Sequence, residues 1–332
     1  MTFQFFTIAI CTYNRDAVLP YSLNAALGQN FDRKKFEILV VTNNCTDKTQ
    51  ILVDDYMSRH SIVRCVNETR QGLSFARNKA VEQAKGDMII YVDDDAEICP
   101  DYLSHLQKLV EEEKEIGAVG GPIEVGWFGT VPPWYEAGLD RAFNHLYHGS
   151  FRMKLKYPRV IYGTNMVFPV SLLKKIGGFR TEIGIIGEGS LTKREKGVFR
   201  KIEKKERERL DTTGYGETDI EILLEIEKKE GLPVIYDPQL KVRHLISPER
   251  LTPEYILTKA LWQGRSQYRL ERIYGLKGGV RHAFSCLFES RIRLLLGRSS
   301  EILSERLLQS LATGYLKEWW SSLPKRLKKS SL

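Results

Sequence analysis

Residues 88–96 of the chain read Met-Ile-Ile-Tyr-Val-Asp-Asp-Asp-Ala, an apolar run that ends in three consecutive aspartates. The β-branched and aromatic residues of the run predict a buried strand. Three adjacent carboxylates repel one another, and burying them without a positive partner is very costly. At the carboxyl end of a parallel strand, however, such a cluster faces the crevice in which open α/β sheets bind ligands, and Mg²⁺ is often shared between carboxylates and substrate phosphates. The stretch alone leaves two interpretations open, a site for a metal and a diphosphate or a solvated acidic turn.

Upstream of this stretch, short apolar runs alternate with segments of helical spacing. The sequence predicts strands at residues 5–11, 36–41 and 62–66, and helices at residues 17–29, from about residue 48, and at 75–84. Strand and helix repeated in this order imply right-handed crossovers and a mostly parallel sheet with flanking helices, an α/β fold. The chain has no G-x-G-x-x-G after the first strand and no G-x-x-x-x-G-K-[ST], so dinucleotide-binding and P-loop interpretations lose their main support.

The composition is that of a globular protein with room for one large domain and an appendage. Of the 332 residues, 42% are hydrophobic and 28% are charged. The five cysteines form no C-x-x-C pair, which argues against a disulfide framework or a zinc cluster and suits a reducing compartment. The N-terminus lacks the features of a signal peptide, and no apolar run approaches the roughly eighteen residues of a spanning helix. We therefore expect a cytoplasmic protein.

The positive charge is concentrated in the last quarter of the chain. From Arg250 onward there are sixteen Lys and Arg residues against six Asp and Glu residues, whereas the whole chain has a net charge of +8. From Pro253 onward the spacing is helical, and Leu, Phe and Trp are interleaved with Arg and Lys. This pattern is typical of helices that lie in a membrane interface, and residues 280–332 are the candidate segment. A helical appendage packed on the rest of the protein is an equally good interpretation.

Further short motifs follow one another along the chain. They read Ile-Ala-Ile-Cys-Thr-Tyr-Asn-Arg at 8–15, Val-Val-Thr-Asn-Asn-Cys-Thr-Asp at 40–47, Gln-Gly at 71–72, Ala-Arg-Asn at 76–78, Gly-Gly-Pro at 120–122, Pro-Pro-Trp at 132–134, Gly-Thr-Asn-Met at 163–166, Tyr-Asp-Pro at 236–238 and Val-Arg-His at 242–244. Together with the three aspartates, they resemble the family 2 glycosyltransferases of GT-A fold, in particular inverting enzymes of bacterial polysaccharide synthesis. The match covers roughly residues 3–265, and the order of the motifs makes the combination specific although each one is short.

The resemblance implies a fold, a domain organisation and a reaction. It implies a GT-A catalytic domain over residues 1–248, in which residues 1–120 bind a nucleotide-sugar and residues 121–248 bind the acceptor, followed by a basic helical region at 249–332. A charged insertion at about 190–212 stands where related enzymes place a mobile acceptor loop, and a solvated charged helix is the alternative. The implied reaction is metal-dependent, inverting transfer of a sugar from a nucleotide diphosphate to a hydroxyl of a glycan or lipid-linked acceptor, with UDP as the expected nucleotide and Mn²⁺ or Mg²⁺ as the cation. Nucleic acid is not an expected partner.

The same resemblance assigns roles to individual residues. Nucleotide binding is implied for Thr12, Tyr13, Arg15, Thr42, Asn44, Arg77, Asp93 and Asp94, metal binding for Asp95 and His244, and contact with the acceptor or donor sugar for Trp134, Thr164 and Asn165. The sequence departs from the family at Thr42, where an Asp usually accepts a hydrogen bond from the base. Since Thr carries no charge, the identity of the base stays open.

An inverting transferase also needs a carboxylate within hydrogen-bonding reach of the acceptor hydroxyl. Residues 215–224 read Tyr-Gly-Glu-Thr-Asp-Ile-Glu-Ile-Leu-Leu and resemble the family's acidic motif at the start of a helix. The spacing to Gly231 and to Tyr-Asp-Pro favours Asp219 as the base. Glu217 is its competitor, because a shift of one residue in the alignment would favour it.

Two other functions compete with this interpretation. A sugar-nucleotide-binding scaffold that has lost catalysis is compatible with the unusual Thr42 and with Thr218 in place of the family's Glu. An Asp-dependent phosphohydrolase would have an aspartate nucleophile after a strand. The nucleophile of those enzymes lies in a D-x-D-x-[TV] motif near the N-terminus, whereas Asp95 is followed by Ala96 and Glu97. Turnover of a nucleotide-sugar separates the first alternative from a transferase.

Overall fold

The structure, a computed structural model, describes residues 5–128, 130–135, 139–181, 217–275, 279–295 and 302–322. The chain divides into two compact units, one made of Met1–Gly126 and Asn144–Leu245, the other of Trp127–Phe143 and Ile246–Leu332. The expected insertion at about 190–212 lies outside the described residues.

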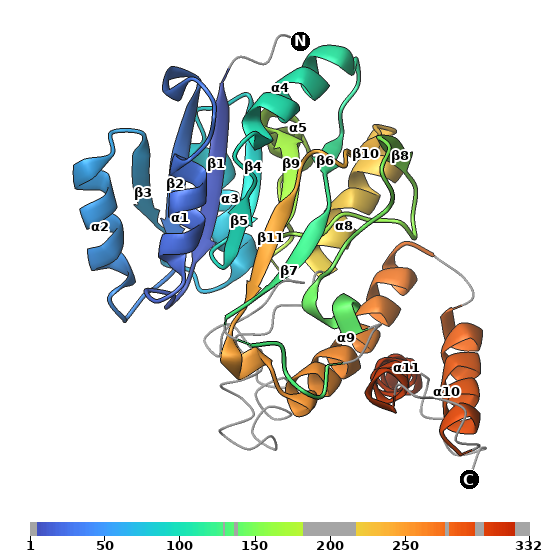
Figure 1. Ribbon diagram of the computed structural model, residues 1–332. Helices are drawn as coiled ribbons and strands as arrows, with labels where there is room; N and C mark the ends of the chain where they lie inside the picture. The colour runs from blue at the N-terminus through green and yellow to red at the C-terminus, as the bar shows by residue number, and fades with distance from the viewer. Residues whose placement is uncertain are drawn as a thin grey trace. The chain divides into compact units, whose positions relative to one another are not determined.

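The first unit is built on an eight-stranded mixed sheet (Figure 1). Its strands are, in spatial order, β3 (Val63–Asn67), β2 (Phe36–Thr42), β1 (Phe6–Thr12), β4 (Met88–Asp93), β9 (Asn165–Pro169), β6 (Ala118–Gly120), β10 (Val234–Tyr236) and β8 (Met153–Leu155). Strands β3, β2, β1 and β4 are parallel, as the alternation of strands and helices predicts. Strand β9 runs antiparallel to both β4 and β6, so the sheet changes direction beside the three aspartates.

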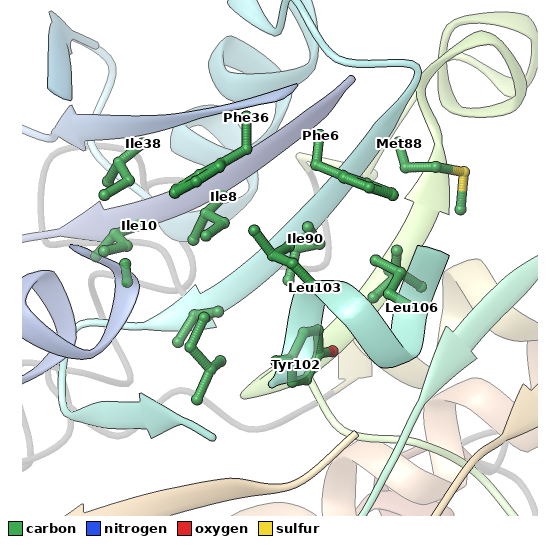
Figure 2. Close-up of a cluster of buried hydrophobic side chains, with 14 of the residues drawn as sticks. Phe6, Ile8, Ile10, Phe36, Ile38, Met88, Ile90, Tyr102, Leu103 and Leu106 are labelled. Atoms are coloured by element: carbon green, nitrogen blue, oxygen red, sulfur yellow. The ribbon is translucent and has the colours of Figure 1, made fainter. Parts of the chain in front are cut away.

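Helices cover both faces of this sheet because each strand is apolar on both sides. On one face α1 (Leu19–Leu27), α2 (Thr49–Arg59) and α4 (Tyr102–Glu112) pack against alternate residues of β1, β2 and β4. Figure 2 shows this layer, with Phe6, Ile8 and Ile10 of β1 on the face of the sheet that α4 covers with Tyr102, Leu103 and Leu106. On the other face lie α3 (Leu73–Gln83), α5 (Val170–Ile176) and α8 (Glu217–Glu225). Because side chains alternate between the two faces along β1, this strand contributes to two hydrophobic cores.

A buried carboxylate connects neighbouring strands near the amino-terminal ends of β1 and β2, away from the three aspartates. Glu37 of β2 accepts hydrogen bonds from Thr7 Oγ1 at 2.9 Å, from Arg64 Nε at 2.7 Å and from the backbone amide of Lys85 at 2.9 Å. Burial alone would raise the pKa of Glu37, but the hydrogen bonds from Arg64, Lys85 and Thr7 outweigh it and lower the pKa. Glu37 therefore ties three neighbouring strands together as an anion.

A second, three-stranded sheet lies next to the aspartates in the sequence. It contains β5 (Ala96–Ile98), β11 (Val242–Ile246) and β7 (Ile123–Trp127), and its central strand β11 pairs with β5 so that His244 is opposite Ala96. The remaining short elements are η1 (Arg33–Lys35), η2 (Leu139–Phe143), the π-helical η4 (Ile226–Glu230) and η5 (Pro248–Arg250). The pairing of β5 with β11 brings a residue 149 positions downstream to the aspartate turn.

The second unit is mainly helical and contains α9 (Pro253–Ile273), α10 (Gly279–Leu295) and α11 (Ile302–Ser322). Helices α9 and α11 approach closely at two glycines, because a methyl group on Gly264 would overlap the carbonyl oxygen of Leu311 and one on Gly314 would overlap that of Leu261. Helix α9 begins with a cap in which Thr252 Oγ1 accepts from the amide of Tyr255 at 3.2 Å. Among the described helices, none has the length and apolar content needed to cross a bilayer. The prediction of an α/β fold with a helical C-terminal region is confirmed.

Candidate functional site

The carboxyl end of β4 meets His244 of β11 in a cluster of potential metal ligands. Asp93 is the last residue of β4, and Asp95 precedes β5, whose pairing with β11 positions His244. The ligand atoms of Asp93, Asp95 and His244 all lie within 4.8 Å of one another, and His244 Nε2 is 3.3 Å from Asp95 Oδ1. Two carboxylates and one imidazole form a donor set that suits Mn²⁺ and related divalent cations. The residues present therefore fit a divalent cation.

The aspartates at the end of β4 lie in a setting that disfavours their charged form. Burial raises the pKa of Asp93, and the negative charge of Asp95 raises it further. Burial likewise raises the pKa of Asp94 to about 7, against the lowering effect of the Arg15 guanidinium. Arg15 lies 3.7 Å from both Asp94 and Asp95, so one cation already balances part of this charge. A bound divalent cation would offset the electrostatic repulsion that remains among the three acids.

The turn that leads into β9 touches two different acids. Thr164 Oγ1 donates a hydrogen bond to Asp93 Oδ2 at 2.7 Å, and the preceding amide of Gly163 donates to Asp219 Oδ2 at 2.8 Å. We call residues 163–164 the two-acid turn. Since consecutive residues hold the two carboxylates, Asp219 of α8 lies beside the aspartates of β4 although 126 residues separate it from Asp93.

Asp219 is buried and paired with a buried arginine. Arg77 Nη1 donates to Asp219 Oδ1, and only 3% of Arg77 and 6% of Asp219 are exposed. The guanidinium carbon of Arg77 lies 5.2 Å from the ring centre of Phe179 and 5.9 Å from that of Tyr91, within the range of cation–π attraction. Burial would lower the pKa of Arg77, but the charges of Asp219 and then Asp93 outweigh it and raise the pKa. Arg77 is therefore the direct partner of Asp219, and the charge of Asp93 also stabilises its guanidinium.

Gly163 leaves no room for a side chain at this contact. A methyl group there would overlap both Asp219 Oδ2 and the Nη2 atom of Arg77. The glycine is thus required for the close approach of its backbone to the ion pair, and not for an unusual backbone angle.

The loops after β1 and β2 hold most of the residues expected to bind a nucleotide. Asn14 Oδ1 accepts from the amide of Thr46 at 2.7 Å, which joins the two loops, and Asn44 Nδ2 donates to Thr69 O at 2.8 Å. Both asparagines have positive φ angles, +53° and +58°, which Asn tolerates better than most residues. Tyr13, which stands between Thr12 and Asn14 in the sequence, is 41% exposed, so its ring is available to a ligand.

Thr42 is turned into the protein and not toward this loop surface. Only 1% of it is exposed, and its hydroxyl lies 3.2 Å from Gln50 Oε1 and 3.4 Å from Asn67 Oδ1. Asn43, which the motif analysis does not single out, donates from Nδ2 to Glu68 O and Arg70 O at 2.8 Å each and accepts from the amide of Gly72. Asn43 therefore shapes the loop between β3 and α3.

The remaining predicted residues lie in different settings. Asn165 is buried, accepts from Tyr102 OH at 2.6 Å and donates to Leu240 O at 2.8 Å, so its amide joins α4 to the segment before β11. Trp134 belongs to the second unit, in which Trp127, Tyr135 and Phe143 form an aromatic cluster. Glu217 is the first residue of α8, and its side chain lies outside the described atoms.

Two further residues of the site were not predicted. Ser22 of α1 donates to the carbonyl oxygen of Asp93 at 3.1 Å, and Asn78 of α3 makes two hydrogen bonds of 2.7 Å with the backbone of Phe179, the ring that stacks on Arg77. Asn78 stands next to Arg77 in the Ala-Arg-Asn motif, so its place in the motif was a signal, whereas the position of Ser22 in an ordinary helix gave none.

Comparison with known proteins identifies a sequence family and several relatives. The sequence profile described as Glycosyl transferase family 2 matches residues 7–177. The glucosyl-dolichyl phosphate glucuronosyltransferase of Haloferax volcanii is 22% identical over 286 residues, which cover 84% of this chain and 81% of that protein. The glycosyltransferase AglE of the same organism is 28% identical over 141 residues, 41% of this chain and 45% of that protein.

Two solved structures resemble the fold. The mannosyltransferase PcManGT from Pyrobaculum calidifontis, in complex with GDP-Man and Mn²⁺, has a TM-score of 0.61 at 17% identity and covers 97% of this chain and 89% of its own. GalNAc-T7 with UDP, GalNAc and Mn²⁺ has a TM-score of 0.56 at 14% identity, with 81% of this chain and 50% of its own covered. At these identities the likeness is one of fold. With the profile covering more than half of its length, the chain belongs to glycosyl transferase family 2 and has the GT-A fold.

Proposed function

We propose that this glycosyltransferase is a metal-dependent, inverting enzyme that moves a hexose-type sugar from a nucleotide diphosphate to a hydroxyl of a glycan or lipid-linked acceptor. The observation that carries the proposal is the two-acid turn. It holds Asp93 of the potential metal cluster on one residue and Asp219 on the next, so a cation-binding group and a candidate base lie side by side.

The donor is assigned to the loops around the aspartates. Asp95 and His244 would hold Mn²⁺ or Mg²⁺, with Asp93 as a further ligand, and the cation would neutralise the diphosphate leaving group. Arg15, beside Asp94 and Asp95, supplies a fixed positive charge at the same place. The exposed ring of Tyr13 is suited to stacking on the base, and Thr12, Asn44 and Asp94 complete the proposed nucleotide site.

We propose that the base of the nucleotide is uracil. The nucleotide-sugars used to test this proposal include guanine nucleotides. The two structural neighbours contain GDP-Man and UDP respectively, so fold alone does not choose between them. Thr42 carries no charge and is turned toward Gln50 and Asn67. The residue at the position of the family's carboxylate is therefore neutral, and uracil is proposed from the family resemblance.

Asp219 is the proposed catalytic base. Its carboxylate is fixed from two sides, by Arg77 on Oδ1 and by the Gly163 amide on Oδ2. It accepts the proton of the acceptor hydroxyl while the hydroxyl oxygen bonds to the anomeric carbon, and the electrons of the breaking sugar–phosphate bond pass to the diphosphate. Attack opposite the leaving group inverts the anomeric centre. Arg77, although expected at the nucleotide, acts in this proposal as a positioning residue for Asp219.

The acceptor is proposed to be lipid-linked, and the enzyme to act at the cytoplasmic face of a membrane. The Haloferax relative is named for a substrate carried by dolichyl phosphate and matches most of this chain. The helices of the second unit expose large apolar residues, among them Phe288, Ile302 and Trp320, in a part of the chain rich in Lys and Arg. Such surfaces associate with anionic lipid headgroups.

Donor binding and transfer are separable by substitution. A panel of nucleotide-sugars is screened with Mn²⁺ for thermal stabilisation, because a ligand that binds only the folded state raises its stability. The best ligand is then tested with Asp95→Ala and Asp219→Asn. We expect both variants to lose transfer, but only Asp95→Ala to lose metal-dependent nucleotide binding.

The alternative, a sugar-nucleotide-binding scaffold without catalysis, makes a different prediction. Such a protein would bind the best nucleotide-sugar without releasing nucleotide in the presence of any acceptor extract. Steady release of nucleotide by the unsubstituted protein, absent in Asp219→Asn, supports the transferase. Full transfer by Asp219→Asn would remove Asp219 from the mechanism and turn attention to Glu217.

A further inference from the structure

A cavity lies among the three helices of the second unit, apart from the residues assigned to the donor. Its volume is about 750 Å³, within the range of small-molecule sites. Four of its nine lining residues are aromatic and come from all three helices, namely Tyr268 of α9, Phe284 of α10, and Tyr315 and Trp319 of α11. The rings pack edge to face in pairs, Tyr268 with Tyr315 at 5.2 Å and Phe284 with Trp319 at 5.9 Å.

The charged residues of the cavity favour an anion. Arg272 and Arg281 line it, both exposed, and within the described part of the chain neither forms an ion pair. Glu271 also lines the cavity, but its carboxylate is already engaged, with Oε1 accepting from Gln267 at 3.0 Å and Oε2 from Tyr315 at 2.6 Å. Glu271 thus fixes the position of Tyr315, and the two guanidinium groups are available to a phosphate.

The cavity is continuous with an apolar stripe on α10. Phe284, Phe288 and Ile292 follow one another at intervals of four residues, so they lie on one side of the helix, and all three are exposed. Phe284 belongs both to this stripe and to the cavity wall, and Arg281 stands one turn before it. The opposite side of α10 packs on the other helices through Ala283. A molecule that lies along the stripe therefore reaches the aromatic wall and the arginines.

We infer that this cavity binds the phosphate and the first isoprene units of a polyprenyl phosphate, the carrier of the acceptor sugar. The inference rests on the proposed lipid-linked acceptor. The arginines match the phosphate, and the aromatic faces match a single methyl-branched, unsaturated chain. The Haloferax relative is named for a substrate of this chemistry, a sugar on dolichyl phosphate. The stripe on α10 gives the chain a path from a membrane interface into the cavity.

Calorimetric titration of the full chain with farnesyl phosphate, without nucleotide-sugar or added cation, tests the inference directly. Farnesol and inorganic phosphate are titrated separately. We expect farnesyl phosphate to bind more tightly than either, because only it fills the wall and pairs with the arginines. Loss of one charge-assisted contact in Arg281→Gln is expected to weaken binding about tenfold. Phe284→Ser is expected to weaken it to a similar degree.

Exposed residues outside the stripe and the cavity wall provide matched controls. Arg291 is exposed on α10 and Phe151 is exposed in the first unit, and neither lines the cavity. Arg291→Gln and Phe151→Ser should therefore bind farnesyl phosphate as the unsubstituted chain does. If these controls lose as much affinity as Arg281→Gln and Phe284→Ser, binding is a property of the surface and the cavity assignment is wrong.

Phospholipid is the competing occupant. Vesicles of phosphatidylglycerol and phosphatidylcholine that displace farnesyl phosphate from the unsubstituted chain would overturn the assignment to a polyprenyl carrier. Asp95→Ala separates this inference from the proposed reaction, because it should lose metal-dependent nucleotide binding and keep farnesyl phosphate binding. If the unsubstituted chain binds farnesyl phosphate but transfers no sugar, the proposed reaction is wrong. If it transfers sugar but does not bind farnesyl phosphate, the cavity assignment is wrong.

Discussion

Arg77 of α3 and Asp219 of α8 form a buried ion pair, although 142 positions separate them in the sequence. Removing one partner of a buried pair leaves an uncompensated charge, whereas removing both does not. The pair therefore links the stability of the first unit to the geometry of its candidate base.

A double-mutant cycle measures this link. Arg77→Gln and Asp219→Asn should each lower the free energy of unfolding by about 3–5 kcal/mol, and the double variant by clearly less than their sum. Denaturant unfolding gives the four values. Arg59→Gln, which breaks an exposed pair with Asp55, serves as the control and should cost no more than about 1 kcal/mol. Additive losses would mean that the two side chains do not interact in solution.

Thr164 is expected to tune the cation site through its hydrogen bond to Asp93. Loss of a partner that orients a metal ligand typically weakens metal affinity about 10–100-fold. Thr164→Val should show a loss of this size in titrations with Mn²⁺ alone, and Thr164→Ser, which keeps the hydroxyl, should not. Equal Mn²⁺ affinity in the valine variant and the unsubstituted chain would exclude Asp93 as a ligand or Thr164 as its support.

Gly163→Ala should damage transfer more than donor binding. The added methyl group overlaps Asp219 and Arg77, so the base must move, and a displacement of about 1 Å can cost roughly 100-fold in rate. Transfer rate and nucleotide affinity are measured on the same preparation. Gly28→Ala, at the end of α1 with a negative φ angle, is the control. A normal rate in Gly163→Ala would argue that Asp219 is not the base.

Glu37 is expected to make the stability of the protein sensitive to acid. Its pKa is lower in the folded than in the unfolded chain, so its contribution is complete above the unfolded value of about 4.5 and is lost as the pH falls through the folded value. The difference in unfolding free energy between the unsubstituted chain and Glu37→Gln should therefore be greatest near pH 7 and shrink in this acidic range. A difference that does not change between pH 7 and pH 3 would show that Glu37 does not titrate with unfolding.

Much of the parallel half of the fold was predictable because local pattern and tertiary structure agree there. The strand expected at 36–41 is β2 with one further residue, and the helix expected at 75–84 is α3 shifted by two residues at its start. Helix α11 lies in the segment expected to be helical from Pro253 onward, but its start at Ile302 was not predicted, since its first turns contain polar residues that weaken the apolar pattern. The antiparallel direction of β9 was not predictable, because it depends on neighbours far away in the sequence.

The candidate site was also predictable only in part. The motifs brought attention to Asp93, Asp95 and His244, which the structure places together. They gave no sign that Arg77 pairs with Asp219, that Thr42 faces inward, or that the amide of Asn165 is used between α4 and the segment before β11. Each of these contacts joins segments separated by the folded chain, and residue type alone does not determine the direction of a side chain.

The antiparallel course of β9 has a consequence for how this enzyme can diversify. Because β9 starts beside the end of β4, the consecutive residues 163 and 164 contact both acids, so the proposed cation ligand and the proposed base depend on the same backbone step. A one-residue insertion there would shift every later side chain of β9 to the wrong side and separate the two chemistries at once. Under the proposed function, we therefore expect sugar preference to change through loops that leave the length of this step unaltered.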